Sequence, residues 1–379
     1  MIFMTLTPLK YPVQEKALIL GIESSCDETA ASVVLWEEGK PIKVLSSIIA
    51  SQNDEHAPYG GVVPEIAARA HLLKIEGVIE NAIQKANINY TDLNAIAATA
   101  GPGLIGGVIT GLMAAKGISM SLSIPLIAVN HLEGHALSPS LSEYCPFPYL
   151  LLLVSGGHTQ LLSVKGLSNY RRIGSTLDDA AGEAFDKTAK VMKLGFPGGP
   201  KVEQLAKNGD SKAIELPRPL IGKNHADFSF AGLKTAVSRA YEASNKTETA
   251  KANIAASFQE AVCDVLSDRS KKAMKIFIDD PDIDSNKKHH FVVAGGVAAN
   301  TTIRESLKIL CENENFKFVA PPLKYCTDNA AMIALAGAQH YAIGNYDSIE
   351  VKARPRWPLD MIAANQKPKS GYGKKGPKS

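Results

Sequence analysis

The chain has 379 residues, 45% of them hydrophobic and 21% charged, and its formal net charge is +3. This length predicts two domains, and the composition is typical of a soluble globular protein. The small net charge excludes a strong overall field for nucleic acid, although a local basic patch stays compatible with it.

Features that would mark secretion or membrane insertion are missing from the sequence pattern. The five cysteines form no C-x-x-C pair, which argues against a disulfide framework and a zinc ribbon. The N-terminal residues do not follow the pattern of a signal peptide, and the first arginine is Arg69. No apolar run approaches the roughly 20 residues that span a bilayer. We therefore expect a cytoplasmic protein with no membrane partner.

The first half alternates apolar strand runs with helical periodicity after a loose extension over residues 1–16. Residues 17–22 are continuously apolar, as in a strand buried on both faces, and the polar turn 23–29 follows them. In chain order we then expect a strand over 31–35, a helix over 63–85, a strand over 95–98, a helix over 100–120 and a strand over 125–129.

The opening pattern recurs at Pro148, which predicts an α/β protein of two similarly built halves with a cleft between them. The second half starts with a strand over 149–154, a turn over 155–159 and a return strand over 160–164. Further expected elements are a strand over 290–294, a helix from near Asn300 and a helix over 327–341. Residues 208–248 are interpreted only as mixed loop and helix, and the lysine-rich stretch from Lys367 as a disordered tail.

Two histidines follow the strand over 125–129. His131 and His135 are four residues apart, so on a helix they share one face and can bind one metal ion. Glu133 is one position too late for the H-E-x-x-H pattern of zinc proteases, and it would point away from the histidine face. The alternative is a pair of structural histidines at a strand-to-helix junction. The spacing leaves both open.

Glycine-rich turns occur at three further strand or helix ends. Glycine lets the backbone approach a ligand closely, and helix N-termini behind such turns bind anions. A tight hairpin is the alternative for each turn alone, but their number favours a nucleotide site. The turns are Ser155–Thr159, Phe196–Pro200 and Gly295–Gly296 with Asn300 behind it.

An acidic segment and a second glycine run are less specific. Residues 178–187 contain four acids, and a helical placement puts Asp179, Glu183 and Asp186 together, suited to ribose hydroxyls or simply to a helix N-terminus. The run over 100–107 lacks the Gly-Lys-Ser/Thr of a P-loop, so tight helix packing explains it equally well.

Taken together, these motifs closely resemble the universal tRNA threonylcarbamoyladenosine synthesis transferase family, TsaD in bacteria. The resemblance covers about 17–359. Its motifs occur in one order: Ile22–Thr29, His131-x-x-x-His135, Val154–Gln160, Asp178–Lys190, Pro197–Pro200, Ala294–Val297 and Cys326–Asn329.

The resemblance implies an actin-like ATPase fold with two related lobes. The implied domains are an N-terminal extension 1–16, a first lobe 17–147 with the helix 327–345 packing back on it, a second lobe 148–326 and a basic tail 360–379. It also implies one divalent metal ion held by His131, His135 and Asp328. Such a ligand set suits ferrous iron, which we favour, or zinc.

The same resemblance implies a nucleotide site. Leu153, Val154, Ser155, Gly156 and Gly157 would wrap the adenylate phosphate. Asp186, Gly199 and Glu203 would line the ribose, and Asn300 would contact the nucleotide from the opposite lobe. ATP or AMP can occupy the same cleft.

The implied reaction transfers a threonylcarbamoyl group from threonylcarbamoyl-AMP to the exocyclic amine of adenosine 37, in tRNAs that read codons beginning with A. Asp27 or Glu28 is our candidate for taking the amine proton. The implied partners are tRNA, TsaB-like and TsaE-like proteins, and a separate synthase that makes the donor.

Two other functions stay as alternatives. A metallopeptidase needs a carboxylate beside the metal-bound water, and Glu133 is misplaced for this role. An ATP-driven scaffold of the actin-like class would manage with magnesium and would not need a three-ligand site. The chain departs from many relatives in its extension, its tail and Ala231, where serine is common.

Overall fold

The computed structural model describes residues 11–364, which form two compact units. The first unit contains residues 11–52, 64–137 and 329–357, and the second contains 53–63, 138–328 and 358–364. The predicted boundary after residue 147 differs from the observed one after 137 because residues 138–147 interact with the second unit, as in the Lys317–Glu143 ion pair. The stretch from Lys367 lies outside the described residues. The predicted tail also begins too early, since Met361–Ala364 form the short helix α11.

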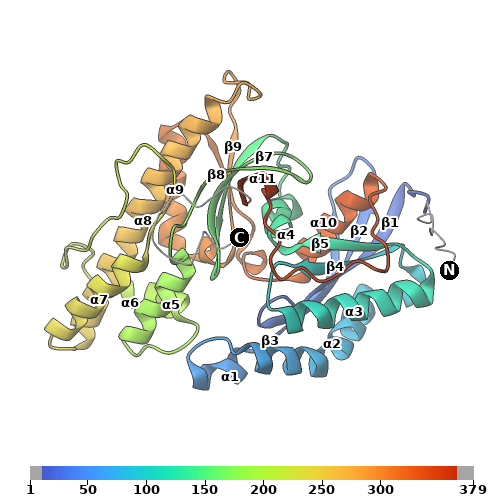
Figure 1. Ribbon diagram of the computed structural model, residues 1–379, viewed down its shortest axis with the longest axis horizontal. Helices are drawn as coiled ribbons and strands as arrows, with labels where there is room; N and C mark the ends of the chain where they lie inside the picture. Colours follow the sequence, from blue (N-terminus) through green and yellow to red (C-terminus); the bar gives the residue numbers. More distant parts are fainter. Residues whose placement is uncertain (1–10, 365–379) are drawn as a thin grey trace, which may run out of the picture. The chain divides into compact units, whose positions relative to one another are not determined.

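The first unit is built on a mixed sheet with strand order β3-β2-β1-β4-β5 (Figure 1). Strand β1 pairs antiparallel with β2 and parallel with β4, which is parallel to β5. The strands are β1 (Lys16–Glu23), β2 (Glu28–Glu37), β3 (Lys43–Ser51), β4 (Ala95–Gly101) and β5 (Leu126–Asn130). The helices are α2 (Pro64–Ala86), α3 (Ile105–Leu122), α4 (His131–Leu137) and α10 (Ala330–Ala342).

Helices cover both faces of this sheet, which explains why residues 17–22 of β1 carry no polar side chain. Leu20 and Ile22 pack into a core with α2 and α3. Gly21, on the opposite face, lies so close to α10 that an added Cβ would be 2.4 Å from the Ala330 carbonyl oxygen. Successive strand residues point to opposite faces, so both sets have to be apolar or small.

The second unit repeats the strand order of the first. Its sheet is β10-β9-β6-β7-β8, and β6 pairs antiparallel with β7 and parallel with β9, as β1 does with β2 and β4. The strands are β6 (Tyr149–Val154), β7 (Thr159–Gly166), β8 (Asn169–Ser175), β9 (His290–Ala294) and β10 (Lys317–Val319). The helices are α1 (Asn53–His56), α5 (Ala181–Val191), α6 (Gly198–Ala206), α7 (Ala231–Ala243), α8 (Glu248–Ile278), α9 (Thr301–Asn313) and α11.

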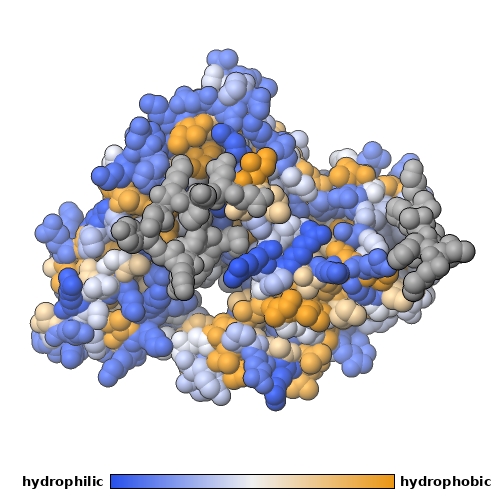
Figure 2. Space-filling view, in the orientation of Figure 1, coloured by the Kyte–Doolittle hydropathy of each residue, from blue (hydrophilic) through white to orange (hydrophobic). Residues whose placement is uncertain are grey.

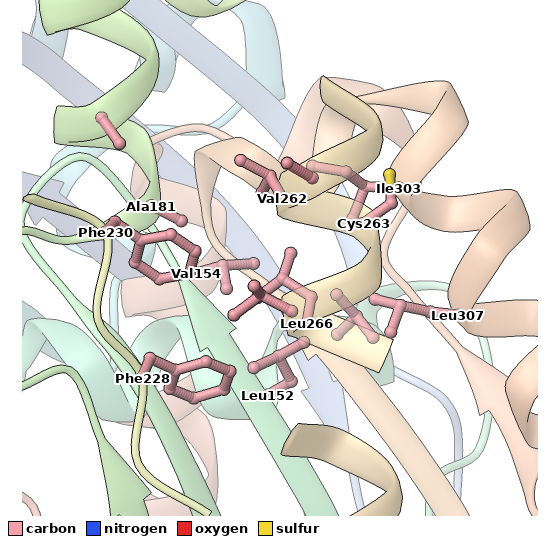
Figure 3. Close-up of a cluster of buried hydrophobic side chains, with 14 of the residues drawn as sticks. Leu152, Val154, Ala181, Phe228, Phe230, Val262, Cys263, Leu266, Ile303 and Leu307 are labelled. Carbon is pink, nitrogen blue, oxygen red and sulfur yellow. The ribbon is translucent and has the colours of Figure 1, made fainter. Parts of the chain in front are cut away.

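The core of the second unit lies between one face of its sheet and the helices α5, α8 and α9. Figure 3 shows Leu152 and Val154 of β6 pointing toward Val262 and Leu266 of α8. Phe228 and Phe230 pack into the same core from a loop before α7. This loop belongs to residues 208–248, which were interpreted from the sequence only as mixed loop and helix. The α/β class is confirmed, with one mixed sheet in each unit.

The expectation that no apolar run approaches the length of a membrane span is corrected by one helix. Among the described residues, α3 is long and apolar enough to cross a membrane by length and composition alone. It packs against β4 and α2, Leu112 and Ala115 belong to the core, and Val108 is also buried.

Candidate metal centre

The short helix α4 carries both predicted metal-binding histidines. It begins directly after β5, and the Asn130 side chain accepts a hydrogen bond of 2.9 Å from the Leu132 backbone N–H. His131 and His135 are buried on one helix face, with ring centroids 4.7 Å apart. Their positions depend on an element that tertiary packing has to stabilise, because seven residues form no stable helix alone.

The structure brings the third predicted ligand to the two histidines. The ligand atoms of His131, His135 and Asp328 all lie within 4.8 Å of one another. Asp328 directly precedes Asn329, whose side chain caps α10 by accepting a hydrogen bond from Met332 N. Gly134 lets α4 approach α10 closely, since a Cβ there would be 2.9 Å from Ile333 Cδ1. The spacing of these donors fits a single divalent cation.

Behind His131 lies a carboxylate that sequence reasoning did not single out. Glu23 ends β1, is fully buried, and its Oε2 atom lies 2.8 Å from His131 Nδ1. The same carboxylate accepts hydrogen bonds from Ser25 N (2.6 Å) and Thr99 Oγ1 (2.5 Å). A carboxylate on Nδ1 fixes the ring and leaves Nε2 for a metal. The only signal in the sequence was a glutamate at the end of an apolar strand.

Glu133 points to a different partner. Its Oε2 lies 3.0 Å from His340 Nε2 in α10, and His340 Nδ1 lies 2.9 Å from Asn345 Nδ2. Both members of the Glu133–His340 pair are buried. The glutamate therefore binds α4 to α10 on the side away from the histidine face, as its spacing predicts.

The turn with the candidate proton acceptors Asp27 and Glu28 is anchored to the same centre. Ser25, in this turn, has its Oγ 3.1 Å from His131 Nδ1. His71 of α2 holds the other side, with Nε2 3.2 Å from the Cys26 carbonyl oxygen and Nδ1 2.8 Å from Thr29 Oγ1. Burial lowers the pKa of His71, which keeps it neutral and able to accept a hydrogen bond at Nδ1.

The predicted phosphate turn lies at the end of β6 in the second unit. The side chains of Leu153 and Val154 are fully buried, so only their backbone can face a ligand. Ser155 closes the turn, because its N–H donates to the His158 carbonyl (2.8 Å) and its Oγ accepts from His158 N (3.1 Å).

Two neighbouring segments pack directly on this turn. At Gly182, in the first turn of α5, a Cβ would be 2.6 Å from the Ser155 carbonyl oxygen. At Gly295, where φ is +99°, a Cβ would be 2.3 Å from the Val154 carbonyl oxygen. The start of α5 and the turn after β9 therefore converge on Ser155, with glycine required at both contacts.

Other glycines here have no structural requirement. A Cβ on any of Gly156, Gly157, Gly199 and Gly296 would meet nothing within 4 Å, and none has a positive φ. Neither backbone conformation nor packing within the described chain excludes a side chain at these positions. Open backbone of this kind is what close approach by a phosphate needs.

Asp186 lines a cavity of about 240 Å³ in the same unit. Its Oδ1 accepts a hydrogen bond of 2.9 Å from Gly198 N at the start of α6. The cavity is also lined by Gly60, Lys190, Lys193, Gly195 and Phe196.

Two predicted nucleotide contacts have hydrogen-bond partners within the protein. Glu203 Oε1 accepts hydrogen bonds from Thr301 N and Oγ1, at 2.8 and 2.6 Å. Asn300 caps α9 through Ile303 N and donates to Gln259 Oε1. The expectation that Asn300 lies in the opposite lobe is wrong, because it belongs to the same unit as the Ser155–Gly157 turn.

The acidic segment is also corrected. Helix α5 begins at Ala181, so Asp179 precedes the helix, although it lies with Glu183 as expected because both carboxylates pair with Lys187. Asp178 instead accepts hydrogen bonds from Ser229 Oγ and Phe230 N, at 2.5 and 2.8 Å, while Lys187 bridges Asp179 and Glu183. These acids hold the loop before α7 and the start of α5.

Comparison with known proteins decides the family. A family model described as "TsaD: tRNA N6-adenosine threonylcarbamoyltransferase" matches residues 43–335. A tRNA N6-adenosine threonylcarbamoyltransferase from Maricaulis maris is 53% identical over 99% of this chain and 100% of the relative. One from Caulobacter vibrioides is 52% identical over 97% and 99%. The chain belongs to the tRNA N6-adenosine threonylcarbamoyltransferase family. It is an acyltransferase that transfers a threonylcarbamoyl group to the N6 atom of an adenosine in tRNA.

Solved structures add information on the fold of this threonylcarbamoyltransferase. Full-length HypF in its phosphate- and nucleotide-bound form matches with a TM-score of 0.52 and 13% identity. The match covers 88% of this chain and 48% of the HypF chain. HypF from T. kodakarensis covers 90% with a TM-score of 0.54 and 14% identity, and 49% of that chain is matched. At such identities the likeness concerns the fold alone.

Proposed function

We propose that this transferase uses threonylcarbamoyl-AMP as donor and modifies adenosine 37 of tRNAs reading codons that begin with A. The observation that carries the proposal is the cluster of His131, His135 and Asp328, whose ligand atoms lie within 4.8 Å of one another. The products would be N6-threonylcarbamoyladenosine and AMP.

The residues present fit a divalent metal ion. Two imidazoles and one carboxylate are a ligand set for ferrous iron or zinc, and we favour iron. The buried Glu23 carboxylate on His131 Nδ1 supports the assignment, because metal-binding histidines usually donate their other N–H to such a group. When bound, the ion would supply Lewis-acid stabilisation of donor oxygens.

The nucleotide part of the donor would bind in the second unit. The backbone from Leu153 to Gly157 would surround the phosphate, supported by the open glycines at 156 and 157. Asp186, Gly199 and Glu203 would line the ribose, and Asn300 would contact the nucleotide. Both Glu203 and Asn300 are held at the start of α9 by hydrogen bonds. The equal strand order of the two sheets supports an actin-like fold with two related lobes.

The reaction depends mainly on positioning the adenosine amine against the carbamoyl carbon of the donor. The exocyclic amine of adenosine is a weak nucleophile, since its lone pair is delocalised into the ring. Its nitrogen would form the new bond to the carbamoyl carbon while the bond from that carbon to the phosphate oxygen breaks and AMP leaves. Asp27 or Glu28 would take the amine proton. The hydrogen bonds of His71 and Ser25 would hold this turn in place.

We assign the protein to the cytoplasm, with TsaB-like and TsaE-like partners and a separate synthase for the donor. Exposed apolar side chains on the adjacent helices α2 and α3 of the first unit support a partner surface there, Leu73 being 86% exposed. Figure 2 shows the apolar area over α3. The exposed side chains are Leu72, Leu73, Ile105, Ile109, Met113 and Met120.

One reconstitution tests the proposal. The protein, its partners, threonylcarbamoyl-AMP and unmodified tRNA are incubated, and the digested tRNA is searched by mass for the modified nucleoside. The nucleoside and AMP should appear in equal amounts and fall together in His135→Ala. Modification from a different donor, or at a different adenosine, would overturn it.

A further inference from the structure

A basic segment crosses the first unit after α10, and the reaction proposed above leaves it unused. We define residues 351–357 as the basic strap. Lys352, Arg354 and Arg356 are exposed, while Val351, Ala353 and Trp357 pack against the core with α2 and α3. In Figure 1 the red chain after α10 crosses the unit above α3, and Figure 2 shows hydrophilic side chains next to the apolar area over that helix.

The backbone of the strap is fixed along its length. Arg354 N donates to the Ala100 carbonyl (2.6 Å), and the Pro355 carbonyl accepts from Gly103 N (3.2 Å). At Gly101 any Cβ would overlap the Arg354 carbonyl oxygen, at 1.8 Å. Lys116 Nζ donates to the Val351 carbonyl at 2.6 Å. The strap therefore presents its cations from an ordered support.

These cations are available for a partner. None of Lys352, Arg354 and Arg356 forms an ion pair with another residue in the described range 11–364. The Arg354 guanidinium lies over the Trp357 ring, 4.4 Å from its centre, which orients the charge without neutralising it. Cations held in this way suit phosphate groups, which need charge and hydrogen-bond donors together.

The strap ends beside the metal centre. The Trp357 carbonyl oxygen accepts a hydrogen bond of 2.9 Å from Asn130 Nδ2, and Asn130 is the residue before His131. At Arg356 the strap borders a hollow of about 620 Å³, roomy enough for a nucleotide, that is also lined by Pro64, Gly103, Leu104, Ile105, Gly106 and Pro355. The end of the strap therefore lies next to the residue that precedes His131, where a tRNA presenting its adenosine to His131 would arrive.

We propose that the basic strap binds the phosphate backbone of the tRNA anticodon arm and guides the target adenosine to the His131 centre. This inference rests on the family's tRNA-modifying activity and goes beyond it, because it identifies an RNA-binding surface. An acidic protein partner on the same surface is the competing occupant. The strap's position beside the ligand helix and the hollow at Arg356 favour RNA.

The test measures the affinity of the full-length protein for unmodified tRNA across a salt series. Arg354→Gln and Arg356→Gln each remove one charge, and each lost phosphate contact should flatten the log–log salt slope by about 0.7 to 0.9. Relative to equal affinities at 1 M salt, the tenfold lower concentration of 0.1 M then gives a roughly five- to eightfold weaker affinity for each variant. KM for tRNA should rise in parallel, and metal content should stay unchanged.

Lys85→Gln is the matched control. Lys85 is exposed in the last turn of α2, 21 residues from Pro64 at the hollow, which places it about 31 Å away along the helix. Its variant should keep the wild-type slope.

The outcomes separate the strap from the transferase function. Strap variants with wild-type slopes would overturn the inference while wild-type modification of tRNA still supports the function. If strap variants lose binding of an acidic protein partner but keep the wild-type salt slope for tRNA, the inference is overturned and the strap is a protein-binding surface. Wild-type protein that neither binds nor modifies tRNA would instead count against the function.

Discussion

Replacing Glu23 by glutamine should separate metal binding from folding. In the wild type, Oε1 accepts from Ser25 N, and Oε2 contacts Thr99 Oγ1 and His131 Nδ1. A glutamine that turns its NH₂ group toward Ser25 N places two donors together. One that turns it toward His131 makes Nδ1 an acceptor, which puts the proton on Nε2, the nitrogen needed for the metal. The first orientation strains the turn at Ser25 that holds His131, and the second opposes metal binding directly.

The expected loss follows from the role of such outer contacts. Partners that orient metal-binding histidines typically contribute 10- to 100-fold in affinity, which is about 1.4 to 2.7 kcal/mol. Competition with a chelator, read by metal analysis, measures the affinity of Glu23→Gln. Glu133→Gln is the matched control, because it changes a second buried carboxylate–histidine pair whose histidine is not a proposed ligand. It should lower the free energy of unfolding by about 1 to 3 kcal/mol and reduce metal affinity less. Wild-type affinity in Glu23→Gln, or equal losses in both variants, would refute the reasoning.

Three other changes test the remaining parts of the site. His135→Ala should lose bound metal and transfer activity together, and full activity in its metal-free form would contradict the metal assignment. Gly156→Val should fold normally, because its Cβ meets nothing within 4 Å, yet lose adenylate binding; normal binding by calorimetry would make the turn a simple hairpin. Burial lowers the pKa of His71. The Glu23 and Asp27 carboxylates act to raise this pKa, and the Lys74 charge acts to lower it. The unfolded chain therefore binds the proton more readily, and stability should fall as pH drops below about 6.5. Urea titrations at pH 7.5 and 5.5 should show a smaller pH effect in His71→Gln than in the wild type.

The sequence predicted those parts of the fold that have a strong local signal. The buried strands β1 and β6 are apolar on both faces, and the runs at 17–22 and 149–154 locate them within one residue. Strand β3 was missed because serines interrupt its apolar pattern. Helix α8 was missed because residues all around it are buried, so it lacks a clear polar face.

The candidate site was predictable only in part, for a related reason. The spacing of His131 and His135 is a local property of a helix, so it can be read directly. Glu23 lies 108 residues from His131 in the chain, and Glu133 lies 207 residues from His340. Such pairs depend on which strands and helices pack together, and nothing near either residue indicates its partner. Asp328 entered through the family resemblance alone for the same reason.

The placement of Glu133 bears on why this centre suits acyl transfer better than hydrolysis. A peptidase of the H-E-x-x-H kind takes its general base from the helix that carries the metal ligands. On α4 the only carboxylate is Glu133, and it is buried against His340 on the side away from the histidine face. The helix therefore offers no base to a metal-bound water. The carboxylates Asp27, at the end of the turn, and Glu28, at the start of β2, belong to a segment anchored on His131 through Ser25. A base in this segment can accept a proton from a nucleophile that belongs to a bound substrate, such as the adenosine amine of a tRNA.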